Sequence, residues 1–404
     1  MRNSGPQAAL STAELVAIVA ALSALNAMSI DIMLPALPDI GADFALANPN
    51  DRQFIVTLYL GMFGVSQLAY GPLSDAFGRR SVLIWSLALF IAGAALCVLA
   101  PTFEVFLAAR ALQGLGAGAT RVVSVAIVRD LTEGRRMAQV MSMAMTVFMI
   151  VPIVAPSVGQ LILFAGPWRW IFAALLLYAL VVFAWSMWRL PETLRPENTT
   201  PFQPRAIAGA YLSMLRTRQF VGYLIATTFI SAALISYITA SEQLYVEVYH
   251  LGAAFPFAFA AVAIAMTFGT FANSRIVMRQ GMRRISHGAL LLFITFAAIL
   301  AALVAAGLAS FWVFLAALSL TLGLFGFIGG NFNALAMEPV GRVAGSASAL
   351  YGAASSAGSA LLATLIAHQF DGTALPFAIG LMIAGILCLG AVLLTERGRL
   401  FSAT

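Results

Sequence analysis

Apolar residues are gathered into long runs that are separated by short polar segments along the chain. A helix needs about 20 consecutive apolar residues to cross the hydrocarbon core of a bilayer. Twelve runs suit this length, and they begin near residues 14, 53, 81, 103, 137, 168, 219, 253, 286, 309, 342 and 374. They lack the alternation of apolar and polar residues that is typical of barrel strands. The pattern predicts an all-α membrane protein with twelve transmembrane helices.

The composition excludes a soluble domain, because 61% of the 404 residues are hydrophobic and 9% are charged. All 22 basic residues are arginine, and the net charge of +6 is spread over short loops, so no nucleic-acid partner is expected. With the N-terminus inside, Arg52 and Arg169 lie outside, Arg110 and Arg121 lie within the fourth run, and the other 18 are cytoplasmic. The positive-inside rule therefore predicts cytoplasmic N- and C-termini in a lipid bilayer.

A polar, proline-containing stretch over residues 191–218 follows the sixth apolar run. We interpret it as a cytoplasmic linker between an N-terminal six-helix half, residues 1–190, and a C-terminal six-helix half, residues 219–404. The second half repeats the first weakly, since the segment around Gly281 lies 203 residues after the one around Gly78. The sequence thus predicts two pseudo-symmetric halves.

The turn over residues 71–81 is a compact polar segment between two apolar runs. Its candidate residues for a cytoplasmic gate are Gly71, Asp75, Gly78, Arg79 and Arg80. Pro72 is expected to stop the preceding helix, and the arginines are expected to anchor the turn. In the second copy Met278 stands where Asp75 would be. We therefore expect the latch to be stronger in the N-terminal half.

Asp31 places a carboxyl group about two turns before the first apolar run closes. An acid inside a membrane is costly and usually faces the bundle interior or a wet cavity. The alternative is a carboxylate that reaches the outer surface. We favour a protonation site, because burial disfavours the charged form of a carboxyl group and lets it exchange a proton near neutral pH.

The fourth apolar run carries two arginines, Arg110 and Arg121. Eleven residues at 100° each bring their side chains within about 20° of one another, some 16 Å apart along the helix. Both are expected to face one polar path. Arg110 near mid-membrane requires an interior partner or a function, whereas Arg121 could be an additional cytoplasmic anchor.

Other polar residues of the apolar runs are candidates for binding sites. The proton-coupling and substrate set is Asp31, Arg110, Gln113 and Tyr59, and the further substrate-lining candidates are Arg121, Tyr237, Glu242, Asn331 and Asn333. Glu242 could instead lie at the outer surface, which is the interpretation that we favour. The two asparagines are expected where the tenth helix closes. Pro152, Pro156 and Gly159 share one stripe of the fifth helix, which is expected to bend there and to suit a surface on which two halves rock.

The sequence offers no pattern for catalysis or for a cofactor. It has no Ser-His-acid set, no Cys/His metal spacing and no glycine-rich phosphate loop. We expect neither an enzyme nor a scaffold, because a scaffold would not need the intramembrane Asp31 and Arg110.

The chain resembles the major facilitator superfamily of transporters, and within it the Bcr/CflA group of drug:proton antiporters. The superfamily resemblance is carried by residues 71–81, 110–118 and 152–159, and the group resemblance by residues 31–38, 129–131, 155–156, 168–172, 190–193 and 345–350. It spans nearly the whole chain. Three departures are Ala76 in place of a basic residue, an unusual Arg121, and Glu242 where relatives commonly have proline.

The resemblance implies efflux of hydrophobic or amphiphilic drugs in exchange for protons across the bacterial cytoplasmic (inner) membrane, as in multidrug and antibiotic resistance. It implicates Asp31 and Arg110 in coupling. Our hypothesis is that protonated Asp31 and substrate compete for an apolar cavity between the halves. Arg110 would bias the pKa of the carboxyl group, and the Gly71 turn would hold the outward-facing form closed on its cytoplasmic side. We expect a monomer that binds a small molecule and protons. The alternative is an uptake symporter, or an exporter of an endogenous small molecule, on the same fold.

Overall fold

The computed structural model describes residues 10–401, apart from the side chains of residues 138, 198 and 342–344. Twelve helical segments of the described chain are long and apolar enough to cross a membrane, which confirms the predicted fold class. They are α1 (Thr12–Asp31) with its continuation α2 (Leu37–Asp43), α3 (Phe54–Phe77), α4 (Arg79–Leu99), α5 (Phe103–Leu131), α6 (Gly134–Ala165), α7 (Arg169–Arg189), α9 (Arg218–Glu242), α10 (Phe255–Gln280), α11 (Met282–Ala305), α12 (Phe311–Gly323) continued by α13 (Phe325–Met337), α14 (Ala344–Ala367) and α15 (Leu375–Thr395). The short helix α8 (Pro204–Leu215) precedes α9.

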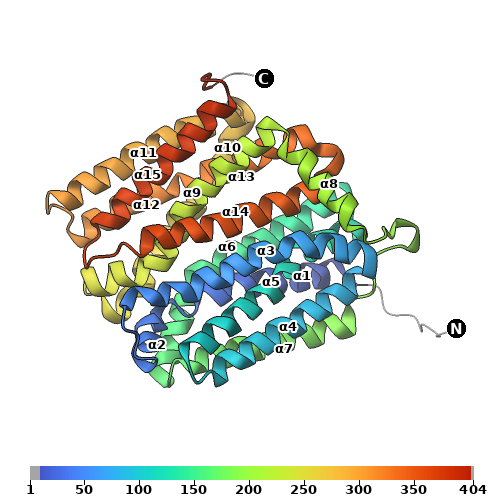
Figure 1. Ribbon diagram of the computed structural model, residues 1–404, viewed down its shortest axis with the longest axis horizontal. Helices are drawn as coiled ribbons and strands as arrows, with labels where there is room; N and C mark the ends of the chain where they lie inside the picture. The colour runs from blue at the N-terminus through green and yellow to red at the C-terminus, as the bar shows by residue number, and fades with distance from the viewer. Residues whose placement is uncertain (1–9, 402–404) are drawn as a thin grey trace.

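The helices form two groups with the same internal arrangement. In the first group α5 packs against α3 and α4, while α7 packs against α1 and α4. The second group repeats this with α13 against α10 and α11, and with α15 against α9 and α11. Between the groups α3 packs on α14 and α6 packs on α10, which are equivalent contacts related by a pseudo-twofold axis. Figure 1 shows the blue-to-green group beside the yellow-to-red group. The exact boundaries 1–190, 191–218 and 219–404 stay a prediction.

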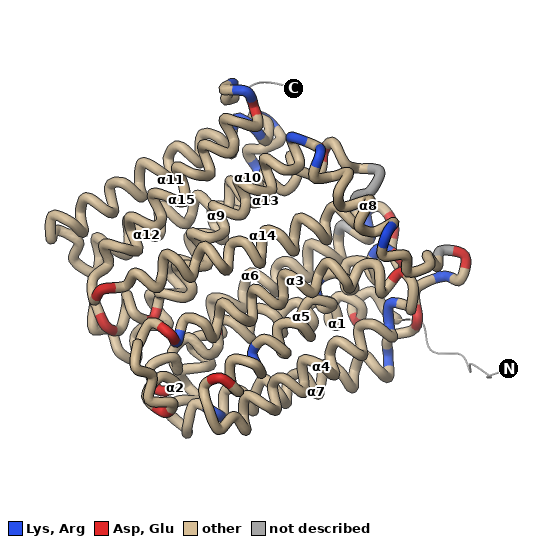
Figure 2. Tube along the Cα trace, viewed as in Figure 1, with Lys and Arg blue, Asp and Glu red and all other residues tan. Residues whose placement is uncertain are grey.

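An even number of spans brings the start of α1 and the end of α15 to the same end of the bundle, which we call the termini end. Figure 2 shows most of the arginines gathered at this end, with α8 beside them. We call the opposite end, where α2 lies, the far end.

Pro72 does not stop a helix, so the expected break there is wrong. The helix α3 continues through Pro72 to Phe77. A proline lacks the N–H that would bond the carbonyl four residues earlier, here Leu68. In the structure the hydroxyl of Tyr211, on α8, donates to the Leu68 carbonyl at 3.0 Å. The linker helix thus satisfies the acceptor that the proline leaves free.

The tenth span does not close at the glycine–asparagine segment, as the sequence had suggested. A break at Leu324 separates α12 from α13, and Asn331 and Asn333 lie inside α13. Asn331 is buried and donates to the Asn273 side chain at 2.9 Å and to the Phe327 carbonyl at 2.8 Å. It therefore joins α13 to α10, while Asn333 is exposed.

Glycine allows the backbones of α4 and α5 to touch. A Cβ atom on Gly116 would lie 2.3 Å from the amide nitrogen of Phe90 and 2.7 Å from the carbonyl oxygen of Ser86. Backbone atoms cannot move aside as a flexible side chain can. Even one methyl group would therefore force the two helices apart.

We predict that Gly116→Ala destabilises the protein by about 2–3 kcal/mol, as overpacking of a tight core does. Gly288→Ala is the matched control, because a Cβ atom there meets nothing within 4 Å. It is expected to be neutral or to stabilise by up to ~1 kcal/mol through helix propensity. Thermal melting of both variants in detergent provides the measurement, and equal melting temperatures would contradict the packing argument.

Candidate functional site

Arg110 is enclosed by neutral groups from three helices. Its guanidinium donates to the backbone carbonyls of Ser29 at 3.0 Å and Ile55 at 3.2 Å, and to the side chain of Gln113. It also lies over the ring of Tyr59, 4.5 Å from the centroid. The side chain is fully buried. Arg110 thus ties α5 to α1 and α3, and Gln113 and Tyr59 belong to the same cluster.

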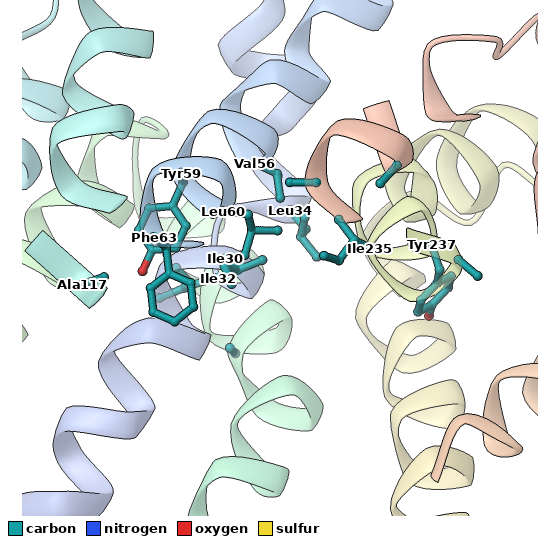
Figure 3. Packing of buried hydrophobic residues seen from close by; sticks show 14 of the residues in the cluster. Ile30, Ile32, Leu34, Val56, Tyr59, Leu60, Phe63, Ala117, Ile235 and Tyr237 are labelled. Atoms are coloured by element: carbon teal, nitrogen blue, oxygen red, sulfur yellow. The ribbon is translucent and has the colours of Figure 1, made fainter. Parts of the chain in front are cut away.

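Asp31 is buried at the C-terminal end of α1, in agreement with its expected place inside the bundle. Within the described part of the chain it forms no ion pair with Arg110 or with any other cation. Its neighbours in sequence, Ile30 and Ile32, belong to the apolar cluster that Figure 3 shows. Asp31 is therefore a buried carboxyl group without an ion-pair partner among the described residues, and it is not paired with Arg110.

The apolar cluster around Asp31 continues across the boundary between the two helix groups. Figure 3 shows Leu34, Leu60 and Ile235 from the two groups close to one another, with Tyr237 beyond them. Tyr237 is buried, its ring stacks on Phe259 at 5.4 Å, and its hydroxyl has no hydrogen-bond partner among the described residues. Tyr237 thus places a buried hydroxyl, without a partner among the described residues, on the α9 side of this boundary.

Glu242 is buried, which corrects the expectation that it lies at the surface. It is 1% exposed and faces Arg52 of the other helix group at 3.4 Å. Arg52 is itself buried and also forms an ion pair with Glu247. The carboxyl oxygens of Glu242 accept no hydrogen bond from the described residues. This arrangement joins the two groups at the far end of the bundle.

Amide side chains extend the same connection. The amide of Gln53 donates to Gln243 at 2.6 Å and to the Ala367 carbonyl at 2.9 Å. Asn50 donates to the carbonyl oxygens of His368 and Phe370 at 3.2 and 3.0 Å. We call these residues, with Arg52, Glu242 and Glu247, the far-end network. No local pattern in the sequence signals this network, because the partners are about 190 to 320 positions apart.

At the termini end, the predicted gate residues contact one another within the first helix group. Arg79 pairs with Asp75 and with Asp130, the latter at 3.1 Å. Gly78 has a φ of 94°, and a Cβ atom there would lie 2.4 Å from Oε2 of Glu192. The carboxylate of Glu192 accepts from the amide of Arg79 at 2.8 Å and from that of Arg80 at 3.2 Å. It therefore caps the N-terminus of α4, where negative charge is favourable.

The second helix group carries an equivalent cluster built from other acids. Arg283 pairs with Glu396 at 3.0 Å and with Glu338 at 3.4 Å, whereas Met278 is 88% exposed. Burial opposes the ionisation of Glu396, but hydrogen bonds from Tyr223 and Arg283 outweigh it and keep the pKa of its carboxyl group below the usual range. Glu396 lies 204 residues after Glu192, which is close to the repeat spacing of 203. The repeat spacing could therefore have identified Glu192 and Glu396 as equivalent acids from the sequence.

The remaining candidates lie on the surfaces between the groups. Pro152 is half-buried, while Pro156 and Gly159 are buried, in the helix that packs on α1 and α10. A Cβ atom on Gly159 would lie 1.9 Å from the carbonyl oxygen of Ile32, so this glycine permits a close approach between α6 and the segment that follows α1.

Arg121 is exposed, unlike Arg110, so the two arginines do not share one environment. Gly71 lies near α14, since its Cβ atom would be 4.0 Å from Ala349.

Comparisons with known proteins agree with this architecture. The family model described as Major Facilitator Superfamily matches residues 19–363. A bicyclomycin resistance protein homolog of Haemophilus influenzae is 30% identical over 383 residues, which cover 93% of this chain and 94% of the relative. Multidrug resistance protein MdtL of Escherichia coli is 34% identical over 230 residues, or 56% of this chain and 57% of MdtL. The crystal structure of a D-xylose-proton symporter superposes with a TM-score of 0.77 at 16% identity, covering 97% of this chain and 99% of that one.

We predict that Glu192→Ala lowers the free energy of unfolding by about 1–2 kcal/mol, because it removes a charged cap from two backbone amides. The melting temperature should fall by several degrees. Glu197→Ala is the control, since Glu197 is exposed in the same linker and accepts no such hydrogen bond among the described contacts. An equal shift in both variants would mean that charge, and not the cap, matters.

Proposed function

The chain belongs to the major facilitator superfamily, and on this basis we propose that it exports hydrophobic or amphiphilic small molecules across the bacterial cytoplasmic membrane in exchange for protons. Transport would proceed by alternating access of the two six-helix halves. The names of the relatives, a bicyclomycin resistance protein homolog and a multidrug resistance protein, support the export direction.

The observation that carries the proposal is that polar contacts join the halves at one end. Among the described residues, the side-chain hydrogen bonds and ion pairs between the halves involve residues 50–57 on one side and residues 242–247 and 364–370 on the other. The charged clusters of Arg79 and Arg283 at the termini end stay within their own halves. Such a protein can open at one end while it is closed at the other. With cytoplasmic termini, the far-end contacts would close the protein on its outer side.

Proton coupling rests on Asp31. A carboxyl group buried without a counter-ion is held most cheaply in its neutral form. Exposure to water in another conformation would release the proton. A membrane potential adds about 2.3 kcal/mol per charge per 100 mV, so inward proton movement can drive export against a gradient. Because Arg110 is satisfied by neutral groups, its effect on Asp31 would be through the position of α1 and not through an ion pair.

We predict that Asp31→Asn abolishes uphill export in proteoliposomes under an imposed pH gradient, while substrate still binds. Asp371→Asn is the control, because Asp371 is an exposed acid in the loop between α14 and α15. Uphill export by Asp31→Asn would disprove the assignment. Movement of substrate in the same direction as the protons would indicate a symporter and would contradict the export direction.

We further predict that Arg52→Gln favours opening of the far end, because it leaves Glu242 buried without a cation. Breaking a buried pair costs several kcal/mol, so labelling of a Leu34→Cys reporter, which is buried at the boundary between the halves but outside the network, by a membrane-impermeant maleimide should speed up at least about tenfold. The background would have Cys97 and Cys388 replaced by alanine.

Arg169→Gln is the matched control for this experiment. Arg169 lies at the same end but bonds within its own half, to Asp43 at 2.5 Å and to the Ala100 carbonyl at 3.3 Å. The Arg169→Gln substitution therefore removes the same positive charge and leaves the far-end network intact. Equal acceleration in both variants would show that net charge, and not the inter-half contact, controls opening.

A further inference from the structure

We propose that Arg121 binds a negatively charged group of the transported molecule, so that preferred substrates are amphiphilic anions or zwitterions and not simple cations. The inference rests on the proposed function, since it names the substrate class of the same central path.

Arg121 lies deep in the bundle and is still reached by solvent. It precedes the end of α5 at Leu131 by ten residues, which is about 15 Å along the helix. The helix packs against α1, α3 and α4, so it belongs to the interior of its half. Protein atoms surround Arg121 densely, yet the residue is exposed. Arg121 is therefore a residue inside its half whose side chain is still accessible to a bound molecule.

The position faces the boundary between the halves. The adjacent residue, Val122, lies 3.8 Å from where a Cβ atom on Gly71 would be, and the same Cβ atom would lie 4.0 Å from Ala349 of α14. Tyr351, two residues further along α14, lies within electrostatic range of Arg121. Its hydroxyl contacts Thr227 at 2.5 Å. A molecule bound at Arg121 would therefore contact both halves.

Arg121 is a cation without a counter-ion in the described part of the chain. No carboxylate lies within ion-pair distance of it there, and none of the hydrogen bonds found among the described residues involves its guanidinium. The other deep cation, Arg110, is buried and already donates to three acceptors. Asp31 is buried as well. The accessible charge far from the helix ends is thus positive.

A free guanidinium in this setting has a specific chemical preference. Its planar fork of N–H donors matches a carboxylate, sulfonate or phosphonate in two parallel hydrogen bonds. The low dielectric of the surroundings strengthens that attraction and equally strengthens the repulsion of a cation. Apolar walls would accept the remainder of an amphiphilic molecule.

The test uses the full-length protein in lipid nanodiscs and two probes with the same ring system, anionic fluorescein and cationic rhodamine 6G. We expect Arg121→Gln to weaken fluorescein binding by about tenfold or more, to leave rhodamine 6G binding unchanged or tighter, and Arg121→Lys to keep most of the affinity. Arg275→Gln is the control, because Arg275 is an exposed arginine near the termini end of α10. It should change neither affinity.

Three results would overturn the inference. They are equal weakening of both probes by Arg121→Gln, tighter binding of rhodamine 6G than of fluorescein by the unmodified protein, and loss of co-purifying anionic lipid from Arg121→Gln with no change in fluorescein binding. The last would assign Arg121 to a lipid headgroup. If fluorescein binding depends on Arg121 but no pH gradient drives its transport, the inference stands and the proposed proton exchange fails.

Discussion

The burial of Arg110 is the constraint on which the rest of the first half depends. A guanidinium in a membrane bundle must have its donors satisfied inside the protein, because lipid offers no acceptor. Here the carbonyl groups of Ser29 and Ile55 and the side chain of Gln113 supply them, and the ring of Tyr59 covers the cation. These acceptors come from α1, α3 and α5, so satisfying one charge fixes the relative position of three helices. Asp31 lies two residues after Ser29 on α1, so the same contacts also fix where Asp31 lies.

Duplication explains why the two ends of the bundle differ. At the termini end each half satisfies its own arginine, Arg79 with Asp75 and Asp130, and Arg283 with Glu338 and Glu396. A charge satisfied within one half places no demand on the other half, which leaves that end free to separate. At the far end Arg52 has its carboxylates on the opposite half, so satisfying it requires closure. The same kind of interaction thus acts within each half at one end and between halves at the other.

The sequence predicts the spans because each must provide about 20 apolar residues, and that requirement is local. It also predicts that Asp31 and Arg110 lie inside, since neither can face lipid cheaply. What it misses depends on partners far along the chain. Pro72 does not end α3 because Tyr211 supplies a donor to Leu68, and Glu242 is buried because Arg52 faces it. Helix geometry places Arg110 and Arg121 on one side of α5, but it does not determine that Arg110 is enclosed and Arg121 exposed.

The burial of Asp31 and the exposure of Arg121 limit how a proton and a substrate can influence one another. Direct competition at a single point would require the carboxyl group and the substrate site to lie in the same compartment. In the described form Asp31 is buried, whereas Arg121 is exposed. A proton on Asp31 and an anion at Arg121 then cannot exclude one another by contact. Each can only favour a conformation, because a ligand shifts an equilibrium by its difference in affinity for the two states. The Arg110 cluster, which joins α5 to α1 through Ser29, is the physical connection between those two sites.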